Sequence, residues 1–123
     1  MKKLVYSLFL IHLFSCAVFN GKLKDPFEGK FQVTVLDIDG VGDVPGILTI
    51  SKKKDSYNSS VVYKQDGVKT SMNIISSYAI DESTFIVEAF IDGNQIDFEL
   101  NFENNDIIGM AGGYYEVVGV RIE

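Results

Sequence analysis

Apolar and polar residues alternate along most of the chain with a period of two, which is typical of β-strands that bury one face. In the clearest example, Ile96, Phe98, Leu100 and Phe102 are separated by single polar residues. No segment shows a comparable apolar period of 3.6 residues, so no helix is predicted beyond the N-terminal region. The alternation predicts strands at 29–38, 46–53, 56–64, 68–79, 84–91, 95–103, 106–111 and 114–122.

Turn-forming residues separate these strands at short and even intervals. Asp66-Gly67, Asp92-Gly93-Asn94 and Gly112-Gly113 are examples. Tight turns between neighbours favour an antiparallel meander, and eight strands can close into a small barrel without exposed edges. We therefore predict an all-β fold, a single eight-stranded antiparallel up-and-down barrel, with a β-sandwich as the alternative. The pair Ser76-Ser77 predicts a bend or bulge within 68–79.

The first 17 residues depart from this pattern. Lys2 and Lys3 precede an apolar run from Leu4 to Phe14, and a cluster of small residues follows at 15–17. This order is typical of a secretory signal peptide, and the apolar run is shorter than the roughly 20 residues of a membrane-spanning helix. We therefore expect an exported protein with a signal peptide over 1–17, a short tether over 18–26 and a β-barrel domain over 27–123.

The end of the signal peptide is compatible with two different cleavage sites. Ser15 and Ala17 suit cleavage after Ala17, which releases a soluble domain. Leu13-Phe14-Ser15-Cys16 resembles a bacterial lipobox, in which the chain is cut before Cys16 and this cysteine is acylated. In a bacterium the expected location is therefore the periplasm, or the outer membrane as a tethered lipoprotein; in another host the protein is expected to be secreted.

Loss of the leader restricts the chemistry of the remaining domain. It removes the only histidine, His12, and, with cleavage after Ala17, the only cysteine, Cys16. It takes two of the 11 basic residues and none of the 17 acidic ones, which leaves a net charge of −8. Zinc and copper sites and Ser-His-Asp or Cys-His catalysis need the missing residues, and nucleic acid needs clustered cations. We predict no enzymatic activity, metal site, cofactor or nucleic-acid partner; a carboxylate-based hydrolase is the remaining catalytic alternative.

Two positions at opposite ends of the domain carry a family resemblance. Gly29-Lys30-Phe31 opens the first predicted strand and Arg121 lies near the end of the last. This resembles the lipocalin-like (calycin) pattern of Gly-x-Trp on the first strand and a basic residue on the final one, with Phe in place of Trp. The resemblance implies a barrel of bacterial exported proteins that binds a small apolar molecule. The first and last strands of such a barrel pair, so we expect Gly29, Phe31 and Arg121 to close one end, with a cation–π contact worth about 0.5–2 kcal/mol.

Further matches lie within the chain. The stretch from Gly42 to Leu48, together with Gly109 and Gly119-Val120-Arg121, is also similar to small lipocalin-like domains.

The inward faces of the strands supply candidate ligand-binding residues. On the last strand the pattern does not decide which face points inward, and this concerns the candidates Tyr115 and Val117. The candidates are Phe31, Val33, Phe85, Val87, Phe98, Leu100, Tyr115 and Val117.

The end of the barrel opposite Phe31 and Arg121 is the predicted mouth. Each of its turns contains glycine, and the longest predicted loop, 37–46, lies there. We predict an acidic rim around an apolar interior; the alternative is that Asp and Gly serve only to form the turns. The rim residues are Asp37, Asp39, Asp43, Asp66 and Asp92.

Two interpretations of function follow. The first is an exported lipocalin-like domain that binds a small apolar or amphipathic ligand inside the barrel. The second starts from a filled interior, because an eight-stranded barrel can be just wide enough for its own side chains. The protein is then an acidic interaction or inhibitor module with a basic protein partner. In both cases membrane contact is expected only through lipidation of Cys16.

Overall fold

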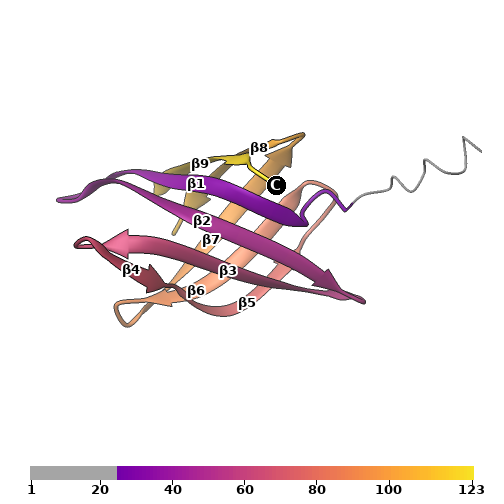
Figure 1. Ribbon diagram of the computed structural model, residues 1–123, viewed down its shortest axis with the longest axis horizontal. Helices are drawn as coiled ribbons and strands as arrows, with labels where there is room; N and C mark the ends of the chain where they lie inside the picture. The colour runs from indigo at the N-terminus through magenta and orange to yellow at the C-terminus, as the bar shows by residue number, and fades with distance from the viewer. Residues whose placement is uncertain (1–24) are drawn as a thin grey trace, which may run out of the picture.

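Antiparallel strands make up the whole fold of the computed structural model, which describes residues 25–123 (Figure 1). They form one sheet in the order β4-β3-β2-β1-β9-β8-β7-β6-β5. Figure 1 shows β1, β2 and β3 crossing in front of β6, β7 and β8, so that the sheet curls into a nearly closed barrel. The strands are β1 (Gly29–Ile38), β2 (Gly42–Lys53), β3 (Ser56–Gln65), β4 (Val68–Ser71), β5 (Asn73–Ala79), β6 (Thr84–Ile91), β7 (Asn94–Glu103), β8 (Asp106–Ala111) and β9 (Tyr115–Arg121).

The predicted all-β antiparallel barrel is confirmed, and the alternative of two packed sheets is wrong. No helix within residues 25–123 is long and apolar enough to cross a membrane. The signal peptide over 1–17, its cleavage site and lipidation at Cys16 lie outside the described residues, so export and location stay predictions. Asp25 and Pro26, the last residues of the expected tether, contact the barrel.

The strand count of eight is wrong by one, because the strand predicted over 68–79 breaks at Met72. The part before the break, β4, pairs with β3, and the part after it, β5, pairs with β6. The Met72 amide still donates to the Val61 carbonyl (2.9 Å). At Met72 the chain therefore changes its pairing partner from β3 to β6. The barrel closes at this point without a continuous ladder between β3 and β5. The β5–β6 ladder also shifts register between Ile74 and Ser76, beside the predicted bulge.

The loop expected over 37–46 is shorter than predicted, because β1 extends to Ile38 and β2 already begins at Gly42. A tight turn joins β1 to β2, and the Val41 amide donates to the Ile38 carbonyl (2.9 Å). Pro45 lies within β2, opposite Thr34 of β1. The ladder with β3 begins only at Gly46, so β2 has a free edge at Pro45, where a residue without an amide hydrogen is tolerated.

One half of the barrel is filled by aromatic rings. Phe27 precedes β1, enters the barrel and is only 2% exposed. Its ring centroid lies 5.2 Å from that of Phe85 and 5.0 Å from that of Phe102. Phe31 and Tyr57 complete the cluster, with centroids 5.2 Å from Phe102 and 5.9 Å from Phe27 respectively. We call this half of the barrel the closed end.

Arg121 covers the closed end from outside. Its guanidinium carbon lies 4.7 Å from the centroid of the Phe31 ring. Nη1 donates to the Glu28 carbonyl (2.8 Å) and Nη2 to the Pro26 carbonyl (3.1 Å). Gly29 leaves space for this arrangement, because a Cβ at this position would collide with Nη1 of Arg121. The arginine therefore joins the last strand to the segment that leads into the first.

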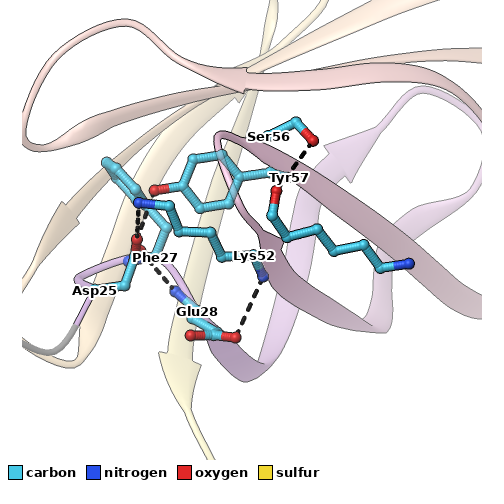
Figure 2. Close-up of polar contacts among 7 residues, drawn as sticks. Asp25, Phe27, Glu28, Lys52, Ser56 and Tyr57 are labelled. Atoms are coloured by element: carbon cyan, nitrogen blue, oxygen red, sulfur yellow. Dashed lines mark hydrogen bonds and ion pairs between the residues drawn. The ribbon is translucent and has the colours of Figure 1, made fainter.

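Asp25 holds the entering segment in place (Figure 2). Its carboxylate accepts hydrogen bonds from the Phe27 amide (2.9 Å) and the Tyr57 hydroxyl (2.7 Å), and the ammonium of Lys52 lies 3.4 Å away. Burial opposes ionisation of Asp25, but the hydrogen bonds from Tyr57 and Phe27 outweigh it and lower its pKa. Burial and, next, the hydrogen bond to Asp25 raise the pKa of Tyr57 to about 12.

The hydrogen bond from Tyr57 to Asp25 predicts a loss of stability in strong alkali. Folded Tyr57 keeps its proton to higher pH than an unfolded tyrosine, whose pKa is 10.0, so its contribution is fully present below pH 10. We expect the contribution to disappear as the pH rises through about 12. Urea unfolding between pH 9 and 12 should show a smaller decline for Tyr57→Phe than for the unmodified protein. Equal declines would contradict the assignment, since the other tyrosines titrate in both proteins.

Candidate functional site

The half of the barrel opposite the closed end is hollow. It contains a cavity of about 640 Å³ that opens between the glycine-containing turns. These turns join β1 to β2, β3 to β4, β6 to β7 and β8 to β9. We call this opening the mouth. The cavity lies at the end of the barrel where the turn pattern predicts a mouth.

The difference between the two halves follows from the size of the inward side chains. In the closed end these are the phenylalanine and tyrosine rings described above. Around the cavity they are mostly small or β-branched, and several strands contribute one each. Examples are Val33, Gly46, Val61, Val87, Ala111 and Val117. The same barrel is therefore wide enough for a ligand at one end and filled by its own side chains at the other.

Six of the eight predicted interior residues line the cavity. They come from four strands and include both candidates on the last strand. The six are Val33, Val87, Phe98, Leu100, Tyr115 and Val117.

The other two predicted interior residues, Phe31 and Phe85, do not line the cavity. Both are 0% exposed and belong to the aromatic cluster of the closed end. Both side chains point inward, as the alternation predicts. They lie nearer the closed end of the barrel than the cavity does.

Only two of the five aspartates predicted for the acidic rim border the cavity. Asp66 and Asp92 border the cavity, and Asp37, Asp39 and Asp43 do not. Asp43 accepts a hydrogen bond from the Asp37 amide (2.9 Å), which fixes the start of the β1–β2 hairpin. Asp37, Asp66 and Asp92 have φ values of 48°, 53° and 52°, so these aspartates also act as turn formers.

Tyrosines occupy the mouth beside these carboxylates. Tyr114 and Tyr115 line the cavity and meet edge to face, with centroids 4.8 Å apart. The Tyr115 hydroxyl donates to Asp39 (3.2 Å), which links β9 to the β1–β2 turn. Desolvation is the main cause that raises the pKa of Tyr115 above its ordinary value.

Several lining residues escaped the sequence prediction. Val61 and Tyr63 of β3 face the cavity, and Met72 lines it at the strand break. The alternation of Tyr57, Val61 and Tyr63 could have identified this wall, but Ser59 interrupts the apolar series on the inner face. Polar side chains that line the cavity and were also missed are Lys64, Gln65 and Gln95.

The arrangement combines apolar walls with polar groups near the opening. Such a site can enclose the apolar body of a molecule while hydroxyl, amide and carboxylate groups meet its polar end. Within residues 25–123, no group of three or more His, Cys, Asp or Glu side chains lies close enough together to hold a metal ion. The cavity therefore offers shape, apolar surface and a charged border.

Comparison with known proteins adds no family assignment. No protein-family model matches this chain, and no curated protein matches it either.

Proposed function

We propose that the protein binds a small apolar or amphipathic molecule inside the barrel. The observation that carries the proposal is the apolar cavity of about 640 Å³ at the mouth. Its volume falls within the roughly 300–1,000 Å³ of small-molecule sites. Transfer of apolar ligand surface from water into such a cavity contributes about 25 cal/mol per Å².

The architecture supports the lipocalin-like resemblance as part of this proposal. The barrel is an antiparallel meander whose first and last strands pair, with Phe31 opposite Arg121. The alternative interpretation, a filled interior, describes only the closed end. A basic protein partner is therefore the second candidate, and the cavity favours the small molecule.

A substitution that fills the cavity tests the proposal. Ala111 of β8 lines the cavity and is buried, so Ala111→Phe places a ring in the space meant for the ligand. We expect the neutral fluorophore N-phenyl-1-naphthylamine to bind the unmodified protein saturably and to bind Ala111→Phe at least about tenfold more weakly, since the lost contact area is worth 1.4 kcal/mol or more. Fluorescence titration measures both affinities.

Ile108→Phe provides the matched control on the same strand. Ile108 is 55% exposed on the outer face, and the larger ring there leaves the cavity unchanged. Circular dichroism should show both variants folded. Unchanged affinity in a folded Ala111→Phe variant would contradict binding inside the barrel.

A further inference from the structure

The basic residues of the barrel are concentrated at the closed end. Within residues 25–123 there are seven lysines and arginines, of which five lie at this end and two near the mouth. Both ion pairs of the described residues, Lys30–Glu123 and Lys52–Asp25, also lie at the closed end. The closed-end residues are Lys30, Lys52, Lys53, Lys54 and Arg121, and those near the mouth are Lys64 and Lys69.

The described residues around the mouth carry a net negative charge. The carboxylates of Asp66 and Asp92 border the cavity, and neither forms an ion pair within the described part of the chain. Asp37, Asp39 and Asp43 lie on the neighbouring hairpin. Of the basic residues in the described range 25–123, Lys64 alone lines the cavity, and it lies opposite Lys69 in the β3–β4 ladder. Among the described residues, five aspartates thus outnumber two lysines at the mouth. Charges of one sign around an apolar opening attract ligands of the opposite sign.

Aromatic rings at the mouth also favour a positively charged ligand. Tyr63, Tyr114 and Tyr115 line the cavity, and the face of a tyrosine ring attracts a cation within about 6 Å. The hydrogen bond from Tyr115 to Asp39 adds a carboxylate next to one of these rings. A positive headgroup would therefore meet ring faces and carboxylates together, whereas a carboxylate headgroup would be repelled by Asp66 and Asp92.

We propose that the cavity selects amphiphiles with a cationic headgroup, such as an alkylamine or a quaternary ammonium, over fatty-acid anions. The inference rests on the proposed function: the alkyl chain occupies the cavity, and the headgroup lies at the mouth near Asp66 and Asp92. Neutral amphiphiles bind through the chain and hydrogen bonds at the mouth, without the attraction between opposite charges.

Three probes with the same chain length test this charge preference. Isothermal titration calorimetry of the whole protein with decyltrimethylammonium, decanol and decanoate, each below its aggregation concentration, gives the affinities. At about 10 mM salt we expect the cation to bind about tenfold more tightly than decanol, and decanoate more weakly than decanol. The preference should shrink at 150 mM salt, where charges are screened beyond about 8 Å.

A charge-neutralising pair of substitutions assigns the preference to the mouth. Asp66→Asn with Asp92→Asn keeps a residue type that tolerates the positive φ of both positions. We expect this variant to lose most of the tenfold preference, because its affinity for the cation falls much more than its affinity for decanol. The control, Asp55→Asn with Asp106→Asn, removes the same charge from the β2–β3 turn and the start of β8, both at the closed end, and should keep most of the preference.

The outcomes separate the two proposals. If decanol binds and decanoate binds as tightly as the cation, the charge preference is wrong and the proposed function stands. If the preference survives in the Asp66→Asn, Asp92→Asn variant, its assignment to the mouth is wrong. If none of the three probes binds, the proposed function fails, and the charge preference fails with it.

Discussion

Replacing Phe27 with alanine is expected to lower the free energy of unfolding by about 3–5 kcal/mol. The ring is 2% exposed and contacts the rings of Tyr57, Phe85 and Phe102 inside the closed end. Its loss leaves a cavity that the surrounding strands cannot fill, because their positions are fixed by the sheet. Urea denaturation followed by circular dichroism measures the change.

Phe90→Ala is the control for this prediction. Phe90 lies on β6 and is 44% exposed, so the same truncation at this position should destabilise the protein by less than about 1 kcal/mol. Equal losses in the two variants would show that Phe27 does not form part of the core. Such a result would remove the aromatic cluster as the explanation of why one half of the barrel is filled.

Replacing Gly109 with alanine is expected to destabilise the protein by about 3 kcal/mol, at the upper end of the usual effect of overpacking. A Cβ at Gly109 would collide with the Glu99 carbonyl oxygen and lie 3.0 Å from the Cα of Leu100. Both obstacles are backbone atoms of β7, so no side-chain rotation can relieve the contact. The two strands would have to separate where Leu100 pairs with Gly109.

Gly46→Ala tests the specificity of this prediction. At Gly46 a Cβ would meet the Val62 carbonyl oxygen at 3.1 Å and the Tyr63 Cβ at 3.3 Å, contacts that small shifts can relieve. Urea denaturation should therefore show a clearly smaller loss for Gly46→Ala. A loss as large as that of Gly109→Ala would mean that general strand flexibility, rather than the close approach of β7 and β8, explains the effect.

The fold was predictable because most strands have one face that is less exposed than the other. In β7 the buried Phe98, Leu100 and Phe102 alternate with exposed polar residues, and the alternation alone identifies the strand and its inner face. The break at Met72 was not predictable in this way. Residues of β4 and β5 alternate identically whether the strand pairs with β3 or with β6, and the choice depends on how the sheet closes.

The position of the candidate site was predictable, and its lining residues were predictable only in part. Glycine-containing turns identified the end that holds the cavity, and alternation identified inward residues such as Val33 and Val117. Alternation contains no information on height along the barrel, so it could not separate Phe31 from Val33. The alternation also could not show that Phe27, which lies outside any strand, enters the barrel at its closed end.

The two ends of the described chain lie together, at the pole away from the cavity. Asp25 is held by Tyr57, and the Ile122 amide donates to the Lys30 carbonyl (2.8 Å), so the C-terminal residues also lie at the closed end. Anything joined ahead of Asp25 or after Glu123, whether an anchor, a fused domain or a sensor surface, is therefore attached at the base of the barrel. The opening lies at the other end of the barrel, so such an attachment leaves the cavity uncovered.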